Sequence, residues 1–121
     1  MTAVNISALV RVSLFAGLDT EALTALASTL QRRRYAKGQF IFQRGDPGLC
    51  LYMVESGKVK IVSFSSEGKG LVLNLFGPGD FFGELALLDG EPRSADAVVQ
   101  EPCQLLLLER DDFVRFLETR P

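Results

Sequence analysis

The sequence predicts a mainly β domain with helices at both ends, and three observations favour that fold class. After Tyr35, short apolar segments alternate with clusters of Gly, Pro and Asp, which is typical of antiparallel strands joined by tight turns in a sandwich or barrel. Apolar residues recur at helical spacing before and after that region. The length of 121 residues fits one domain with a hydrophobic core, so we expect a single small β-roll with helical flanks.

The N-terminal flank is expected to be helical over about residues 6–31, with its clearest helix from about Thr20 to about Gln31. Asp19 is a suitable N-cap for that helix. The basic run Arg32–Arg34 would then end it, where cations complement the negative end of the helix dipole. The apolar positions that carry the helical spacing are Leu18, Ala22, Leu23, Leu26, Ala27 and Leu30.

The β-roll is expected over about residues 35–109, as about eight short strands. Six of them are read from the segments QFIF, LCLYMV, KVKIVSF and LVLNLF and from residues 95–99 and 104–108, with SSEGKG as a hairpin turn. The segment KVKIVSF is expected to alternate between two faces, with one face formed by Val59, Ile61 and Ser63 and the other by Lys58, Lys60, Val62 and Phe64. The run Leu105–Leu108 is apolar on both sides and therefore predicts a strand covered on both faces.

The C-terminal flank is expected to be the start of helical structure over about residues 111–121. Asp111 can cap such a helix, and Phe113, Phe116 and Leu117 form a helical stripe. The phenylalanines at positions 40, 42, 64, 76, 81 and 82 are expected in the core, together with Tyr52, with Phe76 near any pocket. Asp46 and Asp80, each beside glycines, are interpreted as residues that cap their own turns.

Composition excludes several classes of function. The chain has no histidine, which removes most zinc sites and the Ser-His-Asp and Cys-His forms of catalysis, so neither a metal site nor an enzyme is expected. The net charge of −2 gives no basic excess for nucleic-acid binding by this chain alone. Cys50 and Cys103 are far apart in apolar contexts and are expected to be free, buried thiols. No apolar run is long enough to span a membrane, and the N-terminus does not have the pattern of a signal peptide, so we expect a cytoplasmic protein.

The stretch FFGELALLDGEPRSA combines residue types that suit a phosphorylated ligand. Gly83 allows a close backbone approach, or a conformation that a Cβ would forbid, at the start of a short helix whose free amides favour phosphate. After the turn, Arg93 offers a planar fork of donors for a phosphate or carboxylate, and Ser94 adds a hydroxyl. Glu84 would instead accept from sugar hydroxyls. A structural ion pair between Glu84 and Arg93 is the alternative.

This stretch also resembles the phosphate-binding cassette of cyclic nucleotide-binding domains. These domains occur in bacterial Crp/Fnr-type transcription regulators, protein kinase A regulatory subunits and cyclic nucleotide-gated channels. KGQFIFQRGDPGLCLYMVESGKVKI resembles the first strands of the family, and LFAGLDTEAL resembles the entry to its N-terminal helices, so the similarity covers nearly the whole chain. The resemblance implies a double-stranded β-helix (jelly roll) that binds a cyclic mononucleotide.

The resemblance also implies roles for individual residues. Glu84 would take the ribose 2′-OH and Arg93 the cyclic phosphate, while Ser94 and backbone amides near Leu85 and Ala86 would add hydrogen bonds to that phosphate. Gly83 would give room at the helix start. Ala95 completes the candidate set on this segment, and Ile61 and Leu73 could face the nucleobase. Phe42 departs slightly from the small aliphatic residue usual at its strand position, a difference expected to affect packing only.

The expected ligand is cAMP or cGMP, with cAMP favoured because Ser94 after Arg93 resembles bacterial cAMP sensors. Family members carry a long helix after the position of Pro121 that closes over the base and often forms a homodimer, and the regulators add a helix-turn-helix domain that binds DNA. We therefore expect a fragment, the sensor part of a Crp/Fnr-type regulator. The alternatives are a Crp/Fnr-like sensor of another effector (haem, an organic acid or a cyclic dinucleotide), a regulatory module of a non-transcriptional protein, and an enzyme on a jelly-roll scaffold.

Overall fold

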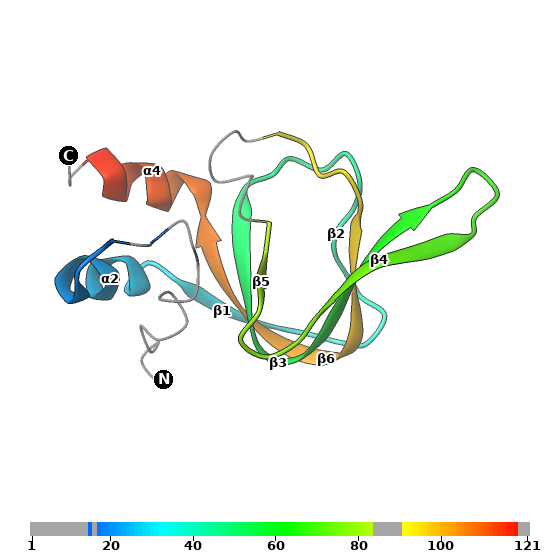
Figure 1. The fold of residues 1–121 in the computed structure, drawn as a ribbon, viewed down its shortest axis with the longest axis horizontal. Helices are drawn as coiled ribbons and strands as arrows, with labels where there is room; N and C mark the ends of the chain where they lie inside the picture. Colours follow the sequence, from blue (N-terminus) through cyan, green and yellow to red (C-terminus); the bar gives the residue numbers. More distant parts are fainter. Residues whose placement is uncertain (1–14, 16, 84–90, 119–121) are drawn as a thin grey trace.

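The computed structural model describes residues 15, 17–83 and 91–118. These residues form two helices and six strands (Figure 1). In chain order they are α2 (Thr20–Ala27), β1 (Gln31–Tyr35), β2 (Phe40–Phe42), β3 (Cys50–Phe64), β4 (Gly70–Phe76), β5 (Phe81–Phe82), β6 (Asp96–Glu109) and α4 (Arg110–Glu118). The predicted mainly β fold with flanking helices is confirmed.

All strand pairs are antiparallel, and the two long strands β3 and β6 form the centre of the sheet. The main order is β1-β6-β3-β4, while β2 pairs with one end of β6 and β5 pairs with β3. Because β3 and β6 are long and curved, the sheet rolls up and brings β2, β4 and β5 around one interior (Figure 1). The two helices lie at one end of this roll, and the β3–β4 hairpin projects at the other.

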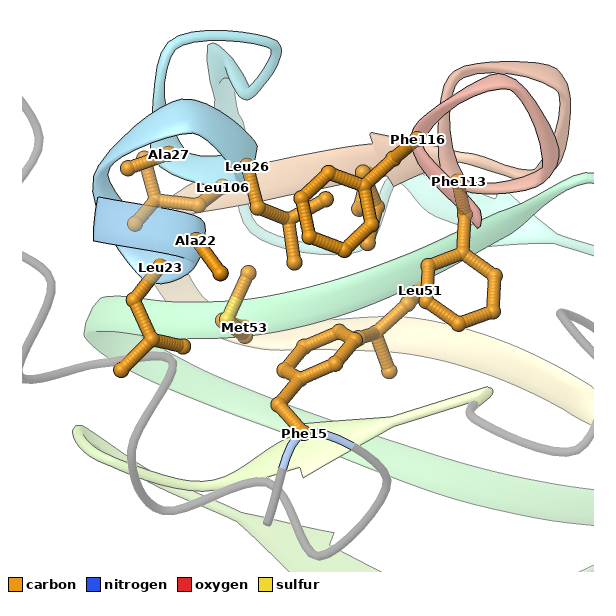
Figure 2. Close-up of a cluster of buried hydrophobic side chains, with 11 residues drawn as sticks. Phe15, Ala22, Leu23, Leu26, Ala27, Leu51, Met53, Leu106, Phe113 and Phe116 are labelled. Atoms are coloured by element: carbon orange, nitrogen blue, oxygen red, sulfur yellow. The ribbon is translucent and has the colours of Figure 1, made fainter. Parts of the chain in front are cut away.

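The core has two parts that share β6. Leu106 and Leu108 face the helices, whereas Leu105 and Leu107 face the inside of the roll, and all four side chains are at most 2% exposed. The prediction of a strand covered on both faces is thus confirmed. Figure 2 shows the helical part, in which side chains of α2 and α4 pack over β3 and β6. Its members are Phe15, Ala22, Leu23, Leu26, Ala27, Leu51, Met53, Leu106, Leu108, Phe113 and Phe116.

Helix α2 begins as predicted and ends earlier than predicted. Asp19 is its N-cap, and the Asp19 carboxylate accepts from the Ala22 amide at 2.8 Å. The helix ends at Ala27, four residues before the predicted end at Gln31. The hydroxyls of Ser28 and Thr29 donate back to the carbonyl oxygens of Ala25 and Leu26, and the chain then leaves in an extended conformation.

The interpretation of Arg32–Arg34 as the end of a helix is wrong. These residues lie in β1, which pairs with β6 from Gln31 opposite Leu107 to Tyr35 opposite Cys103. Their partners are more than 65 positions away in the sequence, so local charge patterning could not reveal them. The strands accordingly begin at Gln31, earlier than the expected start near residue 35, and end at Glu109.

The prediction of about eight short strands is also wrong, because two predicted breaks lie inside continuous strands. Residues 50–64 form β3 and residues 96–109 form β6, and their mutual register shifts three times between Val54 and Val59. Gly57 lies in this irregular stretch with φ +87°, and a Cβ there would approach the Pro102 carbonyl oxygen and the Cys103 side chain well inside contact distance. Glycine therefore bends β3 at this point where a turn was expected.

The predicted hairpin between β3 and β4 is confirmed, but its apolar residues are not core. The Ser65 amide donates to the Lys69 carbonyl at 2.9 Å and closes the turn. Phe64 is 44% exposed, and Phe40 on β2 is 43% exposed, so the prediction that both are core is wrong. The predicted alternation along β3 also fails at Val62, which is buried, because the register with β4 shifts between Ile61 and Val62.

Helix α4 starts at Arg110, one residue before the predicted cap Asp111, which instead lies in the first turn. The Arg110 amide donates to the Leu49 carbonyl at 2.7 Å, and Phe113 and Phe116 enter the helical part of the core.

Cys50 and Cys103 are both free thiols, Cys103 buried and Cys50 half-buried. In the part of the chain that the structure describes, neither helix is long and apolar enough to cross a membrane.

Candidate functional site

The inside of the roll contains a cavity of about 860 Å³, within the usual size range of small-molecule sites. Its walls come from β2, β3, β4, β5 and residues 91–95. Six of the nine predicted site residues line it: Ile61, Leu73, Gly83, Arg93, Ser94 and Ala95. The other three, Glu84, Leu85 and Ala86, lie outside the described residues. Residues that are more than 30 positions apart in the sequence thus converge on one hollow.

The backbone of Arg93 is anchored on the turn that follows β2. The Arg93 amide donates to the Asp46 carbonyl, and the Gly45 amide donates to the Arg93 carbonyl, both at 2.8 Å. The turn itself is closed by the Asp46 carboxylate, which accepts from the Gln43 amide at 2.8 Å, as the sequence predicted. Asp80 closes its own turn in the same way by accepting from the Gly77 amide. The two backbone hydrogen bonds between Arg93 and residues 45–46 fix where the side chain of Arg93 enters the cavity wall.

The guanidinium of Arg93 is buried but only partly hydrogen-bonded. Arg93 is 9% exposed, and its Nη2 donates to the Cys50 carbonyl at 2.5 Å. Its Nε is buried and has no hydrogen-bond partner among the residues that the structure describes. Among the described residues, no carboxylate lies within ion-pair distance of this guanidinium, since the ion pairs found there involve Arg32, Lys58 and Arg115. The predicted alternative, an ion pair with Glu84, falls outside the described residues.

The electrostatic surroundings that the described residues give Arg93 favour an anionic partner. Burial is the main cause that lowers the pKa of Arg93 from its usual value, and nearby Tyr52, Cys50 and Asp46 act in the opposite direction. A buried cation without a paired anion is costly, and the cost falls when a negatively charged group supplies the missing partner. The guanidinium fork is suited to a phosphate or a carboxylate.

Gly83 meets a steric requirement at the same place. Its φ is +83°, in the left-handed region, and a Cβ would lie 2.7 Å from Arg93 Nη1 and 3.0 Å from the Cys50 carbonyl oxygen. The sequence left open whether this glycine serves a ligand or a backbone conformation. The geometry shows the conformation, and it shows that the space next to Gly83 is occupied by the Arg93 side chain.

Part of the cavity wall is apolar. Ile61 and Leu73 lie on the adjacent strands β3 and β4, and Leu73 is the β4 residue left without a partner by the register shift. Phe76 stacks on Phe82 with ring centroids 5.3 Å apart, which provides an aromatic surface beside them. Asn74, which follows Leu73 on β4, also lines the cavity. A flat, mostly apolar group fits this wall.

Sequence reasoning missed part of the lining. Phe42, Phe81 and Phe82 were expected only in the core, Asp80 was expected only to cap its turn, and Glu91 and Pro92 were not assigned to the site. Phe42 could not be placed because it depends on the pairing of β2 with β6, which sets it opposite Ala97. A usable signal existed for Phe81 and Phe82, which directly precede Gly83 in the sequence.

Comparison with known proteins supports the same interpretation. The sequence pattern of the family described as "Cyclic nucleotide-binding domain" matches residues 32–120. This chain belongs to the cyclic nucleotide-binding domain family. The match includes the turn at residues 45–46 and the segment with Arg93, the two parts of the chain that hold the cavity arginine in place.

Three relatives illustrate the range of this family. The cyclic AMP receptor protein of Thermus thermophilus is 44% identical over 108 residues, which are 89% of this chain and 50% of that protein. The N-terminal domain of a transcriptional regulator from Streptomyces coelicolor A3(2) superposes with a TM-score of 0.86 at 38% identity, covering 94% of this chain and 80% of that one. The regulatory domain of Toxoplasma gondii PKA, solved with cAMP, gives a TM-score of 0.80 at 30% identity, covering 94% and 44%.

The chain spans about half the length of the regulators that it matches first. The matches nevertheless cover nearly all of this chain, so they show the family and the jelly-roll fold. The domain is related both to CRP-type regulators and to kinase regulatory subunits.

Proposed function

We propose that this chain is a cAMP-binding regulatory domain, and that it is the sensor of a transcription regulator of the Crp/Fnr type. The observation that carries the proposal is Arg93, a buried guanidinium with no carboxylate partner among the described residues, at the wall of a cavity of about 860 Å³. A cyclic phosphate carries one negative charge and two free oxygens, and it would supply the partner that Arg93 lacks.

The remaining parts of the ligand follow from the cavity. With the phosphate at Arg93 and Ser94, the base would extend over the apolar wall of Ile61, Leu73 and Phe76. The ribose would then lie near the segment after Gly83, where Glu84 is proposed to accept from the 2′-OH and the amides of Leu85 and Ala86 to donate to the phosphate. We propose that Ala95 contributes to the wall beside Arg93, where its buried side chain borders the cavity.

The proposed activity is binding without turnover. No catalytic residue is proposed, and among residues 15, 17–83 and 91–118 no group of three His, Cys, Asp or Glu side chains is placed to hold a metal ion. Signal transmission would require that the nucleotide binds two conformations of the protein with different affinity. We propose that the whole protein forms a homodimer and binds DNA, and the DNA-binding part of this proposal is supported by a relative that is named a transcriptional regulator. A cytoplasmic location stays a prediction.

Isothermal titration calorimetry of the 121-residue chain tests the proposal. We expect saturable binding of cAMP at a 1:1 ratio, weaker binding of cGMP, and binding of cAMP to Arg93→Met that is weaker by about thirtyfold or more. Absence of saturation at millimolar cAMP and cGMP would contradict the proposal. Tighter binding of cGMP would keep the domain assignment and overturn the choice of cAMP.

The same titration separates the alternatives. Binding of an organic acid or a cyclic dinucleotide in place of both mononucleotides would indicate a sensor of another effector. Loss of the nucleotide over time would indicate an enzyme, and it is measured by chromatography of the ligand after the titration. The kinase-type relatives make a non-transcriptional protein the second candidate, because a PKA regulatory domain with cAMP shares this fold over 94% of the chain.

A further inference from the structure

The face of the Arg93 guanidinium is covered by an aromatic ring. Its Cζ lies 4.3 Å from the centroid of the Phe42 ring, and 5.8 Å from the centroid of Tyr52. The shorter of these distances is well inside the range for a favourable cation–π contact. Phe42 comes from β2 and Tyr52 from β3, so two separate strands meet at this cation.

The Phe42 ring is itself held in place by other rings. Its centroid lies 5.8 Å from that of Tyr52 and 6.1 Å from that of Phe82, both in tilted geometry, and Tyr52 and Phe82 stack at 5.1 Å. Tyr52 and Phe82 are buried members of the inner part of the core. The ring that covers Arg93 is therefore part of a packed cluster and has little freedom to turn away.

The contacts that the described residues make with the guanidinium do not neutralise its charge. The Cys50 carbonyl accepts from Nη2 on one edge, the backbone of Gly83 closes in beside Nη1, and the Phe42 ring covers one face. None of these groups carries a formal negative charge. A carboxylate in the place of the ring would hold the arginine equally well but would neutralise it and compete with an anionic ligand.

We propose that Phe42 is a positioning residue for Arg93: its ring holds the guanidinium plane in the cavity wall by a cation–π contact and so prepares it for the phosphate of a cyclic nucleotide. This inference rests on the proposed function. It assigns a binding role to a residue that the sequence suggested would affect packing only. Because the side chain is oriented before the ligand arrives, less conformational freedom is lost on binding.

The local architecture explains why β2 can perform this task. Phe42 pairs with Ala97 on β6, and Gly45 and Asp46, just after β2, exchange backbone hydrogen bonds with Arg93. The strand that supplies the ring and the segment that supplies the arginine are thus joined on both sides of the contact. The distance between ring and cation is set by backbone pairing, which is more rigid than a contact between two surface loops.

The test compares Phe42→Leu with Phe42→Tyr in the 121-residue chain, with Phe40→Leu as the matched control. Phe40 lies on the same strand and is 43% exposed. The ligands are cAMP and adenosine, which share the base and ribose, and both are titrated by NMR so that weak binding is measurable. We expect Phe42→Leu to weaken cAMP binding roughly tenfold and to leave adenosine binding unchanged. Phe42→Tyr keeps the ring and should restore most of the affinity, and Phe40→Leu should match the wild type.

A second measurement works without ligand. The Phe42 ring current should shift the side-chain Nε–H proton signal of Arg93, and the shift should disappear in Phe42→Leu and persist in Phe42→Tyr. Thermal unfolding shows whether each variant is folded, and Phe42→Met replaces Phe42→Leu if the latter does not melt cooperatively.

The outcomes separate this inference from the proposed function. If the wild type does not bind cAMP, the proposed function fails and the inference falls with it. If the wild type binds cAMP and Phe42→Leu binds equally well, only the inference is overturned. Equal losses for cAMP and adenosine would also overturn it, because they would show that Phe42 shapes the cavity without acting through Arg93.

Discussion

Two arginines of this domain lie in opposite electrostatic surroundings. Arg32 lies on β1 and its Nε and Nη2 donate to the two carboxylate oxygens of Glu55 at 2.7 and 3.0 Å, while Gln104 donates to the same carboxylate at 3.1 Å. Arg93 is more deeply buried, yet among the described residues it has a carbonyl and an aromatic ring where Arg32 has a carboxylate.

We interpret this difference as that between a structural arginine, Arg32, and the proposed binding arginine, Arg93. The network of Arg32, Glu55 and Gln104 joins β1, β3 and β6 and is complete without any ligand. The Arg93 site is incomplete, because a charge inside the roll remains without an opposite charge among the described residues. Folding alone favours an arginine that is paired with a carboxylate, as Arg32 is. A buried arginine without such a partner costs stability, and a binding function can explain why a domain retains it.

The largest expected effect is the loss of cAMP affinity when the guanidinium of Arg93 is removed. Arg93→Met should weaken cAMP binding by about 2–5 kcal/mol, which is thirtyfold or more, because the phosphate loses its charged partner. Its thermal midpoint should not fall, because an uncompensated buried charge is replaced by an apolar side chain of similar length. Calorimetry and thermal unfolding measure the two quantities, and Arg32→Met is the matched control with normal binding and a lower midpoint. Normal binding in Arg93→Met would contradict the comparison.

A smaller effect is expected at Gly83. Gly83→Ala should lower the free energy of unfolding by about 1–2 kcal/mol through its positive φ, and should also weaken cAMP binding because the new Cβ displaces Arg93. Gly68→Ala is the control, since Gly68 has φ +81° but open space around it. Urea unfolding should show a larger cost in stability for Gly83→Ala than for Gly68→Ala, because only the former adds crowding to the positive φ, and titration with cAMP should show a loss of binding for Gly83→Ala alone. A loss of binding in Gly68→Ala would show that the crowding at Arg93 is not the cause.

The smallest expected effect is the pH dependence of the stability that the ion pair between Arg32 and Glu55 provides. The hydrogen bond from Arg32 is the main cause that lowers the pKa of Glu55 below its usual 4.5, while partial burial acts in the opposite direction. Since the folded-state pKa is lowered, this group stabilises the fold above the pKa of the unfolded chain, and the contribution is lost as the pH falls through the folded value. As the pH falls from about 5 to about 3, through the usual pKa of a glutamate and below it, the melting temperature of wild type should fall slightly more than that of Glu55→Gln. Parallel curves for the two proteins would contradict this assignment.

Much of the fold could be predicted from local patterns. The cap at Asp19, the hairpin at residues 65–69 and the two-faced strand at Leu105–Leu108 each depend on neighbours in the sequence or on burial alone. The candidate residues from Gly83 to Ala95 were found for the same reason, since they lie within one short segment.

The errors arise where contacts are distant in the sequence. Arg32 was assigned to a helix because its strand partner Leu106 and its carboxylate partner Glu55 lie far along the chain. Phe42 was assigned to packing because nothing near it indicates that β2 brings it beside Arg93. Glycine at position 57 was interpreted as a turn, although its meaning depends on the close approach of Pro102. Pairing between strands is set by the whole sheet, so short segments cannot reveal it.

The most direct test of the contrast between the two arginines is a nitrogen-15 NMR titration that follows both side-chain Nε–H signals as cAMP is added. The account predicts that the Arg93 signal moves and saturates with the ligand, that adenosine does not move it in the same way, and that the Arg32 signal stays in place. A titration in which cAMP saturates the protein while the Arg93 signal does not move would contradict it.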